Sequence, residues 1–214
     1  MIAEPDVTLT DYGLALECGV FAYLLWRRGD PAQRLRIWFT LFFGSVGLAA
    51  LLGGTVHGFF LAVTTTGYRL LWSATLLAIG LAGLAAWGIA ATIQFSGPAA
   101  RAIPALAGIL LAGYAALVIS GMQEFLIAIV FYLPAAAFLL GVLVLTYRRT
   151  ASRQVLAATA GLGLTLVASG LQQAGVGLHP LYFNHNALYH LIQALALLLI
   201  FWGARWFATA RPAP

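Results

Sequence analysis

The stretch NALYHLIQALALLLIFWGARWF, Asn186–Phe207, carries one formal charge, on Arg205, and is otherwise almost entirely apolar. A membrane-spanning helix needs about 20 mostly apolar residues. Within this stretch Asn186, His190 and Gln193 are spaced i, i+4, i+7, which places them on one face of a helix. A polar face on an otherwise apolar helix should point into a bundle rather than towards lipid. The stretch therefore predicts a spanning helix of a polytopic membrane protein.

The composition of the whole chain agrees with that interpretation. Hydrophobic residues make up 62% of the 214 residues and charged residues only 8%, whereas a soluble domain has about 25% charged residues. This composition excludes a soluble domain and a disordered chain, and it excludes nucleic-acid binding despite the net charge of +5. All 11 basic residues are arginines, so Schiff-base chemistry on lysine is excluded. The single cysteine, Cys18, excludes an intramolecular disulfide.

Seven stretches are long and apolar enough to span a membrane, and turn or charge signals separate them. The expected fold is all-α, with seven transmembrane helices in one bundle and one domain over residues 1–214. The predicted spans are Leu9–Trp26, Leu35–Phe60, Tyr68–Phe95, Ile103–Ser120, Gln123–Tyr147, Val155–Ala174 and Asn186–Phe207. Residues 1–10 lack the basic region of a signal peptide, so the first span is expected to stay in the mature protein.

The arginines predict the orientation, because cytoplasmic loops are enriched in basic residues. Ten arginines fall in the first, third and fifth connections and in the C-terminal tail, and only Arg69 falls on the other side with the acids Glu4, Asp6 and Asp11. The N-terminus is therefore expected outside and the C-terminus inside. Arginine without lysine, with abundant Ala, Leu and Gly, favours a bacterial protein of the inner membrane. The ten arginines are Arg27, Arg28, Arg34, Arg36, Arg101, Arg148, Arg149, Arg153, Arg205 and Arg211.

Ionisable groups inside a membrane are rare and need an explanation. With this orientation His57, Glu124 and His190 lie near the outer ends of their spans, together with Gln172 and Asn186, and Glu17 lies about two and a half turns into the first span. We expect His57, His190 and Glu17 to share one pocket, with Asn186 at its rim and Gln172 and Gln193 beside it.

Two interpretations of these residues stay open. His57 and His190 could ligate zinc, with Glu17, His185 or Glu124 as a third ligand. They could instead make hydrogen bonds between helices. Glu17 or Glu124 could accept a proton in catalysis. Otherwise Glu17 is a protonated acid bonded to a neighbouring helix, and Glu124 caps a helix.

The seven spans, Glu17, His57 and the Asn186–His190 segment together resemble the superfamily of alkaline ceramidases and adiponectin receptors, in particular its ceramidase-like branch. The resemblance implies a zinc ion held by His57 and His190, with Glu17 as the acid of the first span. The chain departs from that pattern at three points. Asn186 stands where the family has a histidine, Gly53 stands where it has a serine, and the third span has no aspartate.

Three functions follow as hypotheses. The first is a zinc-dependent hydrolase acting on a lipid amide in the outer half of the membrane, with a bound water as nucleophile. The second is a non-catalytic membrane module that binds a lipid or small ligand, or that serves as an accessory subunit of a membrane complex. The third is haem binding, with His57 and His190 as axial ligands. The expected partners are membrane lipids and a further membrane protein, and not nucleic acid.

Overall fold

The computed structural model describes residues 2–27, 33–179 and 182–209. Each predicted span is a helix, so the all-α architecture is confirmed for the described residues. Arg28 and Arg211, which the predicted orientation places on the cytoplasmic side, lie outside them. The helices are α1 (Pro5–Trp26), α2 (Gln33–Phe59), α3 (Thr66–Gln94), α4 (Ala99–Ile119), α5 (Phe125–Thr150), α6 (Arg153–Gln173) and α7 (His185–Thr209).

Helix starts follow the local sequence. Pro5 begins α1 four residues before the predicted start, since proline suits the first helical turn, where its missing N–H is not needed. The side chain of Thr65 accepts from the backbone N–H of Tyr68 at the start of α3. Asn184 does the same at α7, where its Oδ1 accepts from the backbone N–H groups of Asn186 and Ala187. These side chains satisfy backbone donors that a helix leaves open.

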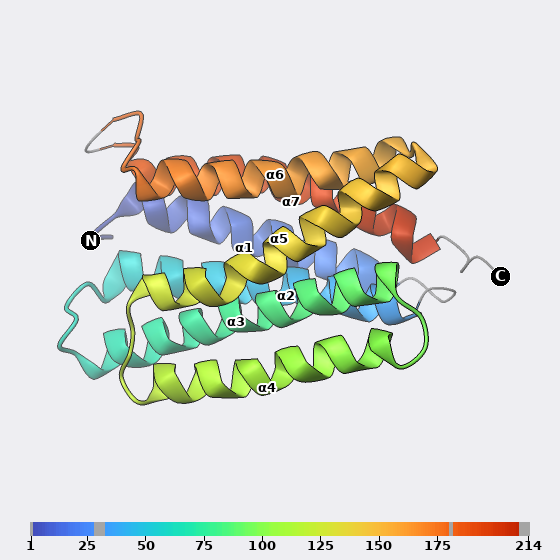
Figure 1. Ribbon diagram of the computed structural model, residues 1–214. Helices are drawn as coiled ribbons and strands as arrows, with labels where there is room; N and C mark the ends of the chain where they lie inside the picture. The colour runs from blue at the N-terminus through green and yellow to red at the C-terminus, as the bar shows by residue number, and fades with distance from the viewer. Residues whose placement is uncertain (1, 28–32, 180–181, 210–214) are drawn as a thin grey trace.

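The helices run back and forth along one direction (Figure 1). The N-terminus and the α2–α3, α4–α5 and α6–α7 connections lie at one end, called here the N-terminal end. The last turns of α1, α3, α5 and α7 lie at the opposite end, called here the C-terminal end. Neighbouring contacts close a ring in the order α1, α2, α3, α5, α6, α7, and α4 packs on α3 outside this ring.

Six helices, α2 to α7, are long and apolar enough to cross a membrane. The fold is thus that of a helical membrane protein. The remaining helix, α1, carries Asp11 and Glu17 and packs against α2 and α7. Many large apolar side chains on the outside of the bundle are exposed, among them Leu16, Ile109 and Val130, as expected for surfaces that contact lipid.

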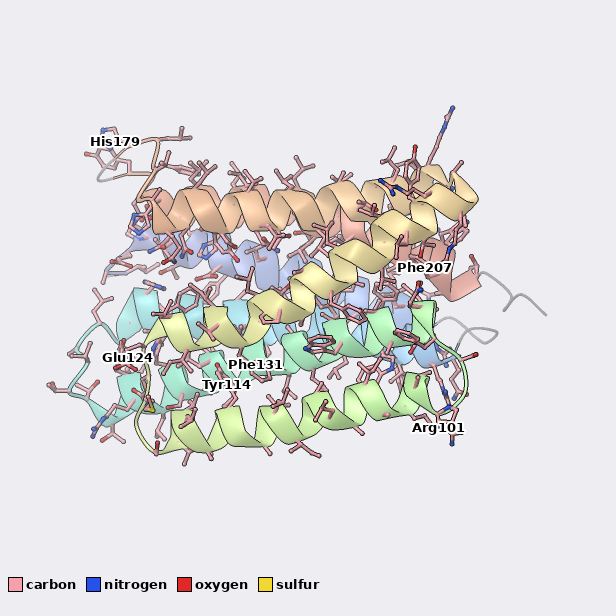
Figure 2. The ribbon with its side chains drawn as sticks, in the orientation of Figure 1. Arg101, Tyr114, Glu124, Phe131, His179 and Phe207 are labelled. Atoms are coloured by element: carbon pink, nitrogen blue, oxygen red, sulfur yellow. The ribbon has the colours of Figure 1, made fainter. Side chains whose placement is uncertain are left out.

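Aromatic side chains fill the interior towards the C-terminal end. The rings of Phe21 and Phe201 stack at 4.1 Å, and Phe43 meets Phe21 edge to face at 5.4 Å. These residues join α1, α2 and α7. A second, smaller cluster attaches α4, where the ring of Tyr114 stacks on Phe131 at 4.6 Å and its hydroxyl donates to the backbone oxygen of Leu76 (Figure 2). The interior is densely packed towards the C-terminal end, where the space left measures only about 10 Å³.

Candidate functional site

A cavity of about 600 Å³ occupies the interior of the bundle, within the half nearer the N-terminal end. All six helices of the ring contribute side chains to it. The walls are mostly apolar, with Val46, Ile79 and Ile129 among them, and the polar groups come chiefly from α1, α2, α6 and α7. This combination of apolar walls and few polar groups is typical of small-molecule sites, which measure about 300–1,000 Å³.

The central polar group of the cavity is a contact between Asp11 of α1 and His190 of α7. Asp11 Oδ1 lies 3.2 Å from His190 Nε2, and the two residues are only 5% and 9% exposed. The other ring nitrogen, Nδ1, lies 3.1 Å from Thr10 Oγ1. Both histidine nitrogens are therefore engaged by neighbouring residues of α1.

The hydrogen bonds indicate where the protons of this group lie. Thr10 Oγ1 lies 2.8 Å from the backbone oxygen of Asp6, and when it donates its hydrogen there it accepts from His190 Nδ1. With hydrogen on Nδ1, a neutral imidazole has a lone pair on Nε2. The contact with Asp11 then requires one proton between the two residues, on the carboxyl group or on the ring. In either form the pair has no net charge.

His57 lies in the last turn of α2 and also lines the cavity. Its Nδ1 lies 2.5 Å from Glu4 Oε2, just before α1 begins. Both side chains are partly exposed at the N-terminal end. The histidines predicted to share a pocket thus line the same cavity, and each has a carboxyl partner from the N-terminal segment.

Amide side chains of α6 and α7 also belong to the polar lining. Gln172 of α6 donates to Asn186 Oδ1 of α7 at 3.0 Å, near the end of the cavity. Gln193 lies two turns beyond Asn186 along α7, is 6% exposed and also lines the cavity. Its Oε1 is buried and has no hydrogen-bond partner among the described residues.

The structure places the other predicted site residues outside the lining of the cavity. Glu17 is half-buried on α1, and its Oε2 has no hydrogen-bond partner among the described residues. Glu124 is the exposed residue at the start of α5, as Figure 2 shows, and His185 begins α7. The three residues do not join His57 and His190 in the cavity lining.

The side chains that could ligate a metal ion are not arranged to do so. Throughout residues 2–27, 33–179 and 182–209, no three side chains of His, Cys, Asp or Glu are placed to hold one. The geometry accordingly provides no metal-bound step to derive. What the arrangement can do is bind: it offers an apolar space with hydrogen-bonding groups at one side.

Asp11 is the site residue that the sequence analysis missed, where it counts only among the acids of the outer side, with Glu4 and Asp6. A signal for its burial was present. Asp11 belongs to the series Val7, Asp11, Leu14, Cys18, Phe21 and Leu25, whose spacing alternates between four and three. All six residues are buried in the structure. A charge within such a stripe must face the bundle.

Comparison with protein families matches residues 7–209 to a family of unknown function, DUF6962. The chain belongs to this family. The match includes all seven helices apart from the first two residues of α1, and it includes every residue of the cavity lining. No curated protein and no solved structure matches the chain.

Proposed function

We propose that this chain is a non-catalytic membrane protein that binds a lipid or lipid-like molecule inside its helix bundle. The observation that carries the proposal is the cavity of about 600 Å³, with apolar walls and polar groups gathered on α1, α2, α6 and α7. Such a space suits an amphipathic molecule, whose chain would contact the walls and whose polar end would reach Asp11, His190 and Gln193.

The proposed ligand enters from the side, between α5 and α6. Helix α5 crosses the bundle from beside α3 at the N-terminal end to beside α6 at the C-terminal end (Figure 1). Leu133 of α5 lines the cavity and is nevertheless 48% exposed, and Gly170 and Gln173 of α6 are likewise both lining and exposed. Lining residues that reach the surface between two helices support an opening towards lipid.

The proposed orientation has the N-terminus outside, with all seven helices crossing the membrane. Eight of the nine described arginines belong to the C-terminal end of the bundle, and only Arg69 belongs to the other. By the positive-inside rule the cavity would then lie in the outer half of the membrane. A bacterial inner membrane remains part of this proposal on the same composition.

Two features favour binding over the zinc-hydrolase and haem hypotheses. The ring nitrogens of His190 are both occupied, by Asp11 and by Thr10. Asn186, at the position where the resembling family has a histidine, bonds to Gln172 instead. Elemental analysis and an absorption spectrum of the purified protein test the choice. Stoichiometric zinc or a haem absorption band would contradict the proposal.

The direct experiment uses two glycines on one face of α6, seven residues apart. A Cβ at either position would meet nothing within 4 Å, but only Gly170 lines the cavity. We expect native mass spectrometry of the wild-type protein in mild detergent to show a bound lipid. Gly170→Leu should reduce its occupancy about tenfold, because the new side chain occupies the opening. Gly163→Leu is the control and should keep the lipid. An empty wild-type protein, or equal occupancy in both variants, would refute the proposal.

A further inference from the structure

Three of the hydroxyl groups that line the cavity donate their hydrogen to a backbone oxygen of their own helix. Thr75 donates to the backbone oxygen of Leu71 at 2.9 Å, Thr165 to that of Gly161 at 3.2 Å, and Ser169 to that of Thr165 at 3.0 Å. A hydroxyl has one hydrogen and two lone pairs. These three groups therefore face the cavity with lone pairs, which accept hydrogen bonds.

A further donor of the lining is also occupied, because the indole N–H of Trp72 donates to the backbone oxygen of Gln123 at 2.8 Å. Three of the five hydroxyl groups in the lining thus donate to a backbone oxygen, and Tyr132 and Tyr189 carry the other two.

The lining also holds acceptors that have no hydrogen-bond partner among the described residues. The buried Gln193 Oε1 has no partner among the described residues, and an amide oxygen without a hydrogen bond in a buried site is unfavourable by about 1–3 kcal/mol. Asp11 binds His190 through Oδ1, and its Oδ2 points towards α2, where it lies 3.7 Å from the position that a Cβ on Gly53 would take.

No arginine among the described residues faces the cavity to attract an anion. The described lining contains no arginine, and the sequence has no lysine. The Asp11–His190 pair has no net positive charge when one proton is shared between the two residues. A phosphate or carboxylate head group would therefore lose its hydration without gaining an opposite charge.

We infer that the ligand of this cavity is a single-chain amphiphile whose polar end donates hydrogen bonds and carries no negative charge, as in a long-chain amine or a monoacylglycerol. This inference rests on the proposed function and specifies the ligand class of the same site. Gln193 is the residue that would accept from the head group, together with the free oxygen of Asp11.

The test compares four probes with the same sixteen-carbon chain, by native mass spectrometry of the full-length protein. Hexadecylamine and monopalmitoylglycerol donate hydrogen bonds, palmitate is an anion, and hexadecyltrimethylammonium is a cation without a donor. We expect the two donors to bind at least about tenfold more tightly than the other two. Tight binding of the trimethylammonium probe would show that charge alone decides, and would overturn the inference.

A matched pair of variants assigns the effect to Gln193. Gln193→Leu keeps a similar volume, removes the acceptor and should reduce the preference for donors to less than about threefold. Gln94→Leu is the control, since Gln94 also has a buried Oε1 without a partner but does not line the cavity. It should leave the preference unchanged. An unchanged preference in Gln193→Leu would overturn the role of this residue.

The outcomes separate the inference from the proposed function. If palmitate binds as tightly as the amine, and Gly170→Leu still prevents binding, the cavity is a lipid site but the inferred head group is wrong. If no probe binds to the wild-type protein, the proposed function itself fails, and the inference fails with it.

Discussion

A carboxyl group and an imidazole meet inside the bundle, where neither could remain alone. Asp11 and His190 are almost fully buried and lie 3.2 Å apart, on two helices that pack side by side. An unpaired ionisable group in such a place is unfavourable, but a pair that shares one proton is tolerated. This explains why both residues belong to the same level of α1 and α7. It also means that each should depend on the other.

We expect a double-mutant cycle to reveal this dependence. Asp11→Leu alone leaves His190 without its partner, whereas Asp11→Leu combined with His190→Leu replaces both by apolar groups. The coupling free energy of unfolding should be about 1–2 kcal/mol, measured by denaturation in detergent micelles. The same cycle with Glu124→Gln in place of Asp11→Leu is the control, because Glu124 is exposed and does not line the cavity. Coupling below about 0.3 kcal/mol for the first cycle would contradict the contact.

Two adjacent glycines in α2 make a second prediction at the scale of the residue. A Cβ on Gly54 would lie 2.7 Å from Asp11 Cβ, which requires α1 to move away from α2. A Cβ on Gly53 would meet its nearest neighbours, Asp11 Oδ2 and Thr75 Cγ2, at an ordinary 3.7 Å. We expect Gly54→Ala to lower the free energy of unfolding by about 1–3 kcal/mol. Gly53→Ala should be neutral or stabilising by up to about 1 kcal/mol.

Thermal unfolding of the two variants in the same detergent provides the measurement. Since both substitutions replace glycine by alanine in one helix, the intrinsic helix propensity changes equally and cancels in the comparison. Equal melting temperatures for Gly53→Ala and Gly54→Ala would show that α1 and α2 do not approach as closely as the structure has them.

At the scale of the element, the sequence predicts the long apolar helices, but it does not predict which helices pack against one another. Each span could be recognised from about 20 apolar residues, and its ends follow turn or capping residues such as Pro5 and Thr65. Predicting that Asp11 is buried requires a second observation beyond the apolar length of its helix. Its helix contains three acidic residues, and only the heptad spacing with Val7 and Leu14 separates the one that faces the cavity from the others.

The direction of helix α5 across the bundle could not be predicted from the sequence. Nothing in Phe125–Thr150 specifies that its first half packs near α3 while its second half approaches α6. The direction of a helix in a bundle follows from how side chains of several helices pack together, and not from its own hydrophobicity. The cavity depends on this crossing, because Ile129 and Leu133 form its wall where α5 is separate from α6. The site residues could therefore be partly identified from the sequence, but the space between them could not.

At the scale of the whole molecule, the positive charge gathers at the C-terminal end, whereas the cavity lies towards the N-terminal end. The arginines of the C-terminal end include Arg101, labelled in Figure 2, whereas the carboxyl groups of Glu4 and Asp6 lie at the N-terminal end. These acids also fix the ends of helices, because Asp6 Oδ2 accepts from the backbone N–H of Asn184 just before α7. One end is thus suited to a cytoplasmic surface, and the other closes over the polar part of the cavity.

The orientation of the molecule is the last prediction, and the chain offers a clean way to measure it. Its single cysteine, Cys18, is buried, so the wild-type protein should give little background with a membrane-impermeant thiol reagent. Thr64 lies in the exposed α2–α3 connection at the N-terminal end, and Ser96 lies in the exposed α3–α4 connection at the C-terminal end. Because arginines gather at the C-terminal end, we expect Thr64→Cys to be labelled in intact cells and Ser96→Cys only after the membrane is opened. Labelling of Ser96→Cys alone in intact cells would reverse the orientation, and it would place the lipid cavity in the inner leaflet rather than the outer.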